Sequence, residues 1–235
     1  MTDFVYEIAC SGAAEQEAAV QAWADGDAVP LWTALPGLTA VDLYRPVRGG
    51  THDPFNDDGP GPLLMAMLQF PTQHQLQAVL ADPQFKTSLS GRPAQAAMTG
   101  TSFERRFYPV GGAMHAEPVL RAPFSYVVRY HHPAQNPSEF VAHYVADHPP
   151  ILGKLPEIRS VLCYLPVAQT GSRVLAPADY MVGNEVVFDS PEAFNAAMDS
   201  PVRLELRTHF RNFPAFTGRN THYPMMRRRV MGRTG

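Results

Sequence analysis

Short runs of alternating hydrophobic and polar residues are separated in this chain by longer stretches with apolar residues at helical spacing. Alternation with a period of two predicts strands, whereas apolar residues three or four positions apart predict helices. Thr72 and Asp82 are suited to be helix N-caps, and Pro83 suits a first helical position. In the first half the pattern predicts strands over 4–10, 37–46, 63–70 and 103–110, and helices over 13–24, from Thr72 to Leu80 and from Pro83.

The cluster Asp25-Gly26-Asp27 predicts the end of the first helix, because glycine and aspartate are poor helix formers. Polar loops are predicted over 47–62 and 167–178, and a linker over 111–121. The second half then repeats the order of the first. It predicts strands over 124–131, 158–166, 179–188 and 221–226, and helices from Pro137 towards His148, from Ser190 to Met198 and from Ser200-Pro201, with Val202, Leu206 and Phe210 on one face.

An internal duplication explains this order, because matching residues recur at nearly constant offsets. Leu35-Pro36 matches Leu155-Pro156 at an offset of 120, as do three later pairs of residues. Phe70 matches Phe188 at 118, and Tyr108-Pro109 matches Tyr223-Pro224 at 115. We therefore predict two domains, a first repeat over 1–112 and a second over 113–235, each with the order β-α-β-β-α-β.

This element order predicts an α+β fold. One β-α-β-β-α-β unit forms a four-stranded antiparallel sheet with both helices on one face. The other face of the sheet would remain an exposed apolar surface unless something covered it. Two units in one chain can cover each other by packing sheet to sheet and closing a barrel, so an intramolecular pseudo-dimer is expected. The sequence does not decide whether two such chains also form a homodimer.

The second repeat carries a resemblance to a known family. The run Phe140…Tyr144…Asp147-His148-Pro149-Pro150…Leu155-Pro156, followed by a strand, resembles the helix-to-strand corner of the EthD family, and the closing Phe213…His222-Tyr223-Pro224 fits the same pattern. The match is good over residues 124–226 and weaker over 4–110. The resemblance implies ferredoxin-like repeats in the dimeric α/β-barrel superfamily, here in tandem. The first repeat has Asp25-Gly26-Asp27-Ala28 where the histidine is expected, so any activity that needs it is expected in the second repeat.

Composition narrows the function classes. The net charge of −3 argues against nucleic acid as a partner, and Arg227-Arg228-Arg229 is interpreted as a frayed, solvated tail at the C-terminus. No apolar run reaches the roughly 18 residues of a membrane span, and no signal-peptide pattern opens the chain. Cys10 and Cys163 lie in separate strand-like runs, which predicts buried reduced thiols in a cytoplasmic protein.

His148 is the leading candidate for an acid or base, since the pKa of an unperturbed imidazole lies near neutrality. Pro149 predicts that the helix ends at His148, where the helix dipole favours the protonated ring. Either Asp147 or a residue from elsewhere could hold one ring nitrogen. A helix-end histidine that only bonds free carbonyls is the alternative. Tyr144 lies one helical turn earlier on the same face and could orient a substrate, or it could simply fill the core.

His222 completes the predicted catalytic set, because its expected counterpart in the first repeat, Phe107, is apolar. Arg129 and His131 fall on one side of their strand, and Tyr126 and Tyr130 on the other. Arg129 is expected to pair with Glu185 inside the barrel. The residues predicted to contact substrate are Tyr126, Arg129, His131, Phe140 and Glu185.

No cofactor and no metal are predicted. The loop His52-Asp53-Pro54-Phe55-Asn56-Asp57-Asp58-Gly59 lacks the ligand spacing and closing glutamate of a calcium loop, so it is interpreted as a solvated turn. Nucleotide-binding, paired-cysteine zinc and nucleophile-elbow motifs are also missing from the sequence.

Three functions remain after these exclusions. The first is a cofactor-independent enzyme that acts on a small aromatic or polyketide-like molecule in an apolar barrel cavity of the second repeat, by dehydration, cyclisation, isomerisation or oxygenation. His148 would be its acid or base, with Tyr144 and His222 positioning the substrate. The second is a non-catalytic carrier or accessory protein for hydrophobic ligands of a degradation pathway. The third is a haem-binding barrel, which the superfamily resemblance admits.

Overall fold

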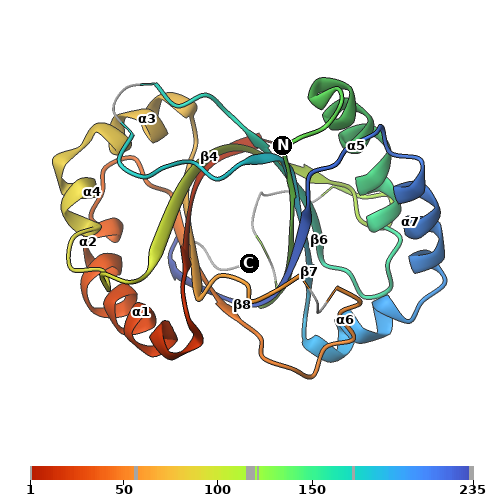
Figure 1. Cartoon of the computed structure of the whole chain (residues 1–235), viewed down its shortest axis with the longest axis horizontal. Helices are drawn as coiled ribbons and strands as arrows, with labels where there is room; N and C mark the ends of the chain where they lie inside the picture. The colour runs from red at the N-terminus through yellow and green to blue at the C-terminus, as the bar shows by residue number, and fades with distance from the viewer. Residues whose placement is uncertain (1, 56–57, 115–119, 121, 171–172, 233–235) are drawn as a thin grey trace.

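The protein forms one closed antiparallel barrel, in the strand order β1-β3-β2-β8-β5-β7-β6-β4, with helices on two opposite sides (Figure 1). The computed structural model describes residues 2–55, 58–114, 120, 122–170 and 173–232. Parts of the predicted linker and loops, at 56–57, 115–119, 121 and 171–172, lie outside the described residues. The α+β barrel built from two sheet-to-sheet repeats is confirmed.

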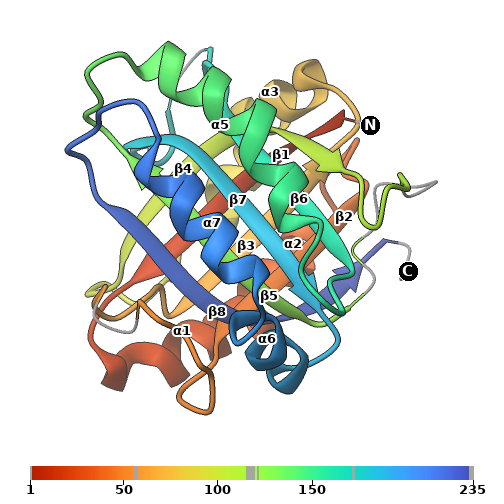
Figure 2. The same cartoon turned by 90° about the vertical axis from the view of Figure 1, so that its right-hand side faces the viewer.

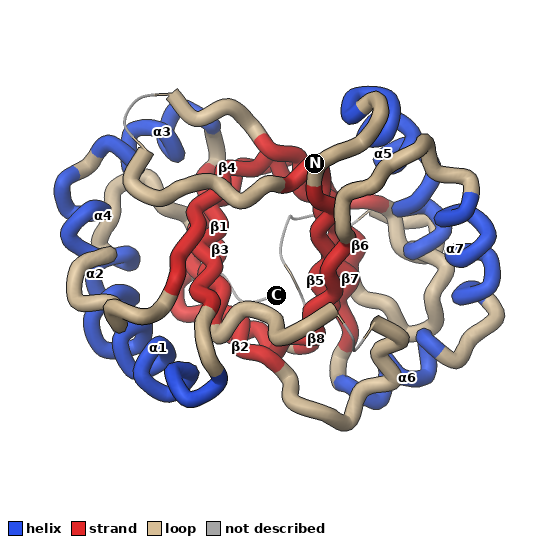
Figure 3. Tube along the Cα trace, in the orientation of Figure 1, coloured by secondary structure: helices blue, strands red, loops and turns tan. Residues whose placement is uncertain are grey.

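The first repeat follows the predicted order, with its helices on one side of the barrel (Figure 3). Its strands begin and end close to the predicted positions, except that the fourth begins six residues earlier than expected. The elements are β1 (Thr2–Ser11), η1 (Ala14–Gln16), α1 (Glu17–Trp23), η2 (Ala24–Ala28), α2 (Val29–Thr33), β2 (Ala40–Pro46), β3 (Leu64–Phe70), α3 (Gln73–Ala81), α4 (Pro83–Ser88) and β4 (Ala97–Tyr108).

The first helical segment does not end at Asp25-Gly26-Asp27, contrary to the sequence prediction. It continues through these residues as a π-helical turn and then as α2. Trp23 before the turn and Trp32 after it are both buried against the sheet. Glycine costs only about 1 kcal/mol in a helix interior, and the burial of two tryptophans outweighs that cost.

The second repeat has the same element order on the opposite side of the barrel. Figure 2 shows α5 and α7 lying across the outer face of its sheet, with α6 at one end. The elements are β5 (Phe124–His131), α5 (Pro137–Leu152), β6 (Ser160–Pro166), β7 (Tyr180–Phe188), α6 (Pro191–Met198), α7 (Val202–Arg211) and β8 (Asn220–Met231).

Helix α5 does not end at His148, as Pro149 had led us to expect, but continues through Pro149 and Pro150 to Leu152. The φ angle of proline fits a helix, and only two carbonyls near the helix end lose their N–H partners. The helix closes with the Gly153 amide donating to the Pro149 carbonyl at 2.9 Å. His148 therefore lies one turn before the end of α5.

Side-chain caps open most of these helices as predicted. Thr72 accepts a hydrogen bond from the Gln75 amide, and Asp82 accepts one from the Gln84 amide. Ser190 caps α6 in the same way. Ser200 does not cap α7, since its hydroxyl donates to the carbonyl of Ala197 instead.

The strand registers confirm two of the three repeat offsets. Phe4 faces Phe70 as Phe124 faces Phe188, which fits offsets of 120 and 118. The offset of 115 for the last strand is wrong. Ile8 faces Gly100 in the first repeat, and its counterpart Val128 faces His222 in the second. Gly100, not Phe107, is therefore the structural counterpart of His222.

Pairing between the repeats closes the barrel, because β4 of the first pairs with β6 and β8 of the second pairs with β2. This pairing corrects the interpretation of Arg227-Arg228-Arg229 as a solvated tail. All three residues lie within β8, where Arg227 and Arg229 both bind the buried carboxylate of Asp42, and Arg228 pairs with Asp25.

Side chains fill the interior of the barrel. An apolar cluster that includes Phe103, Leu162 and Met225 surrounds several buried polar groups. None of the helices that the structure describes has the length and apolar character that crossing a bilayer requires. Cys10 and Cys163 are buried free thiols, as predicted.

Arg129 pairs inside the barrel with Glu7 of the first repeat and not with Glu185, as had been expected. Its Nε donates to the Glu7 carboxylate at 3.2 Å, and both side chains are buried. Burial alone lowers the pKa of Arg129, but the Glu7 carboxylate raises it above its ordinary value. Glu185 instead accepts hydrogen bonds from the hydroxyls of Ser125, Tyr44 and Tyr164. Register explains the difference, since Glu185 faces Val127 and Arg129 faces Gly183.

We predict that Arg129→Met lowers the free energy of unfolding by about 3–5 kcal/mol, because Glu7 is left as an uncompensated buried charge. The double variant Arg129→Met/Glu7→Met removes that charge and should recover part of the loss. Urea unfolding of the three proteins measures both effects. A double variant no more stable than Arg129→Met would contradict a direct pair between the two residues.

Candidate functional site

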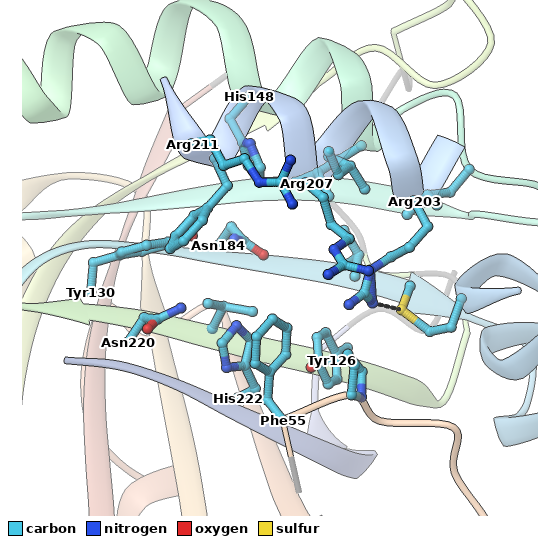
Figure 4. Close-up of a pocket in the computed structure, with 18 residues that line it drawn as sticks. Phe55, Tyr126, Tyr130, His148, Asn184, Arg203, Arg207, Arg211, Asn220 and His222 are labelled. Carbon is cyan, nitrogen blue, oxygen red and sulfur yellow. Dashed lines mark hydrogen bonds between the residues drawn. The ribbon is translucent and has the colours of Figure 1, made fainter. Parts of the chain in front are cut away.

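A cavity of about 480 Å³ lies between the outer face of the second sheet and helices α5, α6 and α7. This position corrects the prediction of a barrel cavity, because side chains fill the barrel interior. Figure 4 shows the side chains that line the cavity. Its wall is mostly apolar, with a few polar and charged groups. The lining residues are Pro54, Phe55, Tyr126, Val128, Tyr130, His148, Leu152, Leu155, Asn184, Val186, Met198, Arg203, Leu206, Arg207, Phe210, Arg211, Asn220 and His222.

His148 reaches one side of this cavity from α5. Its Nδ1 lies 3.2 Å from the Nδ1 of His209 on α7, so one ring donates and the other accepts. Its Nε2 has no hydrogen-bond partner among the described residues. Burial, together with His209 and His143, lowers the pKa of His148 from 6.5 to about 3. His148 is therefore neutral at pH 7, whereas the sequence had led us to expect a dipole-stabilised cation.

His222 reaches the opposite side of the cavity from β8 and is held by Asp58. The carboxylate of Asp58 lies 2.7 Å from Nδ1 and also accepts the backbone N–H of His222 at 2.9 Å. The Phe55 ring stacks on the imidazole, with centroids 3.8 Å apart and planes within 7°. Burial lowers the pKa of His222, and the hydrogen bond to Asp58 opposes that shift.

These contacts correct the interpretation of residues 52–59 as a solvated turn. The loop belongs to the first repeat but packs against the second, where Asp53 accepts the hydroxyl of Tyr126 at 2.7 Å and Asp58 holds His222. Phe55 forms part of the cavity wall. Asn56 and Asp57 lie outside the described residues. Both repeats therefore contribute to the cavity.

Tyr144 and Phe140 lie behind the cavity wall. Both are fully buried in the aromatic core under α5. The side-chain amide of Asn184 donates to the Tyr144 hydroxyl, and the Tyr144 ring lies 4.9 Å from the His148 ring. The Oδ1 of Asn184, a residue of the cavity wall, is buried without a hydrogen-bond partner among the described residues. Tyr144 thus supports His148 and Asn184 from behind.

The other three predicted substrate contacts lie away from the cavity. Arg129 and Glu185 point into the barrel interior, on the far side of the sheet. His131 is buried near Thr221, and burial lowers its pKa to about 4. Of the predicted site residues, the structure brings His148, His222 and Tyr126 together around the cavity. Their roles remain predictions.

The first repeat fills the corresponding space with aromatic side chains. Trp32, 120 positions before Leu152, is fully buried, and its indole N–H donates to Ser88 at 2.8 Å. Ala28 stands where the second repeat has His148. At Gly100, the counterpart of His222, a side chain would collide with the Tyr6 hydroxyl, since an added Cβ would lie 1.9 Å from it. In the first repeat, packing therefore fills the space that corresponds to this cavity.

A metal-ligand set borders the site on the outer side of α5 and α7. His143, Asp147 and His209 can each offer a ligand atom, and these atoms lie within 4.8 Å of one another. Two imidazoles and a carboxylate suit zinc or a similar divalent ion. His143, Asp147 and His209 do not line the cavity.

Several site residues escaped sequence analysis. Asp53 and Asp58 belong to a polar loop whose target no local pattern reveals. His209 and Asn184 lie on elements that were predicted correctly, but their neighbours come from other elements. The only sequence signal was the helix predicted from Ser200-Pro201, with Val202, Leu206 and Phe210 on one face.

Solved structures with the same architecture support the fold. An anthrone oxidase-like protein covers 97% of this chain and 93% of its own, with a TM-score of 0.60 and 15% identity. A proposed monooxygenase from Fusobacterium nucleatum subsp. nucleatum covers 100% and 95%, with a TM-score of 0.58 and 8% identity. One from Lactobacillus acidophilus NCFM covers 98% and 96%, with a TM-score of 0.55 and 8% identity.

An EthD family protein from Bacillus halodurans C-125 covers 43% of this chain and 96% of its own, at 16% identity and a TM-score of 0.33, which is too low to carry an argument. No protein-family model matches the chain, and no curated protein sequence does. At these identities the likeness establishes the fold alone. The dimeric α/β barrel that the resemblance to the EthD family implied is confirmed, within a single chain.

We predict that the stability of the protein falls as the pH drops from 7 to 5, in part through His148. Its folded pKa of about 3 lies below its ordinary value of 6.5, so the unfolded chain binds more protons between these values. The stability contributed by the neutral imidazole is complete above pH 6.5 and is lost as the pH falls towards 3. Urea unfolding should therefore show that His148→Gln loses about 2 kcal/mol less than wild type between pH 7 and 5.

The matched control is His74→Gln on α3, because His74 is exposed. It should keep the wild-type pH dependence. Equal pH dependence in His148→Gln and wild type would show that the His148 ring is not held neutral by burial.

Proposed function

We propose that this protein is a cofactor-independent enzyme that acts on a small aromatic or polyketide-like molecule by acid/base chemistry. The observation that carries the proposal is the pair of imidazoles, His222 held by Asp58 and His148 held by His209, on the wall of one apolar cavity. Such a cavity binds an apolar ligand, and a few polar groups fix its orientation.

His222 is suited to be the base. The Asp58 side chain accepts the hydrogen bond from Nδ1–H and fixes the tautomer whose Nε2 carries the lone pair. The same carboxylate stabilises the imidazolium that forms when Nε2 takes a proton. Phe55 holds the ring plane by stacking on it. A planar ligand that lies in the cavity beside these rings would present an acidic C–H or O–H to this nitrogen.

His148 and Asn184 are suited to the oxygen of the substrate. The neutral His148 ring can donate an Nε2 proton if its Nδ1 accepts from His209, and such a donor stabilises a developing enolate or phenolate. The buried Oδ1 of Asn184, which has no partner among the described residues, can accept a phenolic hydroxyl. Both groups can bind an oxygenated ring system, whereas a plain hydrocarbon would leave them without a hydrogen-bond partner.

The anthrone oxidase-like protein that shares the fold suggests a first substrate to test. In anthrone, the CH₂ group opposite the carbonyl is acidic, so a base can generate an enolate. The enolate then reacts with dioxygen. The ring CH₂ loses both hydrogens and gains one oxygen atom, and the other oxygen atom leaves as water. This reaction needs a base and dioxygen as co-reactant.

A hydrophobic-ligand carrier is the second candidate, favoured by the low pKa of His148. An imidazole with a pKa of about 3 is a weak base. In a carrier, apolar walls alone would determine binding, and no ligand would be converted. A haem-binding barrel would show a Soret band in the absorption spectrum of the purified protein.

We predict that the purified protein speeds the aerobic conversion of anthrone, or of a related phenolic ketone, and that His222→Gln lowers the rate by about 10²–10⁴-fold. Asp58→Asn should lower it by at least about tenfold, because a neutral amide at this position no longer fixes the tautomer of His222. His148→Gln should reduce kcat more than it raises KM. Anthraquinone absorbance measures the rate, and calorimetry measures binding by each variant.

The exposed His74→Gln variant serves as the control and should match wild type. Ligand binding without conversion, equal in wild type, His222→Gln and His148→Gln, would exclude the enzyme and favour the carrier.

A further inference from the structure

Three arginines line one side of the cavity at a spacing of four residues along α7. Arg203, Arg207 and Arg211 are all part of the wall, and Figure 4 shows Arg203 and Arg207 extending from the helix towards Phe55 and Tyr126. The described residues that line the cavity include no aspartate and no glutamate. This part of the wall therefore carries three positive charges and no negative one.

In the described part of the chain, these arginines form no ion pair, unlike several of the buried arginines. Arg105, Arg129 and Arg227 each bind a carboxylate. Arg203 instead lies over the Phe55 ring, with its guanidinium carbon 5.5 Å from the centroid, and its Nη1 contacts the sulfur of Met198. No carboxylate pairs with the three α7 arginines in the described part of the chain. Beside Arg203, a ring and a sulfur atom therefore take the place that a carboxylate has beside Arg105, Arg129 and Arg227.

The counterparts of these residues show that charge is not required by the fold. The offset of 118 that relates Pro83 to Pro201 also relates Phe85 to Arg203 and Leu89 to Arg207. Phe85 is fully buried and contacts the Tyr6 ring at 5.5 Å, and Leu89 is buried as well. At this offset the second repeat therefore has cations, the half-buried Arg203 and the exposed Arg207, where the first has core residues.

Partial removal from water makes the positive charge of Arg203 energetically costly. Burial lowers the pKa of Arg203 below its ordinary value, which records the cost of a charge that is partly removed from water. A carboxylate that entered the cavity would offset this cost. Guanidinium groups bind carboxylates through two parallel hydrogen bonds, and these bonds are stronger in an apolar setting than in water.

We propose that the cavity binds an aromatic carboxylate, with the ring system between Phe55 and the apolar wall and the carboxylate on the arginines of α7. This inference rests on the proposed function and specifies its substrate class. It predicts that the cavity binds an aromatic acid more tightly than a neutral ketone or phenol of the same shape.

The test compares 2-naphthoate with 2-naphthamide, which has nearly the same shape but no charge. Calorimetry at pH 7 should show naphthoate binding at least about tenfold more tightly than the amide, since only the acid can pair with the guanidinium groups. The double variant Arg207→Gln/Arg211→Gln should lose that difference while binding the amide as wild type does. Raising the salt concentration should weaken naphthoate binding only. Arg173→Gln, an exposed arginine elsewhere in the chain, is the matched control.

The outcomes separate this inference from the proposed function. Equal binding of the two probes by wild type overturns the anion inference and leaves the proposed function intact. Preference for naphthoate, combined with substrate turnover that His222→Gln does not change, supports the anion inference and overturns the acid/base function. Failure of both probes to bind overturns the aromatic carboxylate together with the aromatic ligand on which it rests.

Discussion

Pairing of strands between the two repeats is the constraint on which the rest of the structure depends. Each repeat alone would leave one face of a four-stranded sheet exposed, with two unpaired edges. The pairs β4–β6 and β8–β2 remove the edges, and closure buries both inner faces. Because the interior is then sealed, its charged groups need partners, and they find them across the repeat boundary, as Arg129 does in Glu7.

Closure also decides where a ligand can bind. The barrel interior is occupied by side chains from both sheets, so the available space lies outside the barrel, between a sheet and its own helices. In the first repeat Trp32 and Phe85 occupy that space. In the second, the corresponding positions hold the smaller Leu152 and the charged Arg203, and a cavity of about 480 Å³ results.

Residues of both repeats form the cavity. The loop after β2 crosses from the first repeat to the second, where Asp58 holds His222, Asp53 holds Tyr126 and Phe55 forms part of the wall. This arrangement gives the first repeat a role beyond covering a sheet. It also explains why a tandem chain can hold an asymmetric site that two identical chains would have to contain twice.

The sequence by itself determined the element order, the duplication and the barrel, because strand alternation, helix caps and recurring residues are local or periodic signals. It also singled out His148 and His222, and both line the cavity. Local rules failed where burial outweighed propensity, at Gly26 and Pro149 within helices and at Arg227 to Arg229 within a strand. Only the tertiary structure decided that Arg129 pairs with Glu7, that Asp58 holds His222 and that the arginines of α7 face a cavity. Each of these contacts joins elements far apart in sequence, and their partners are set by strand register and loop path, which no local pattern encodes.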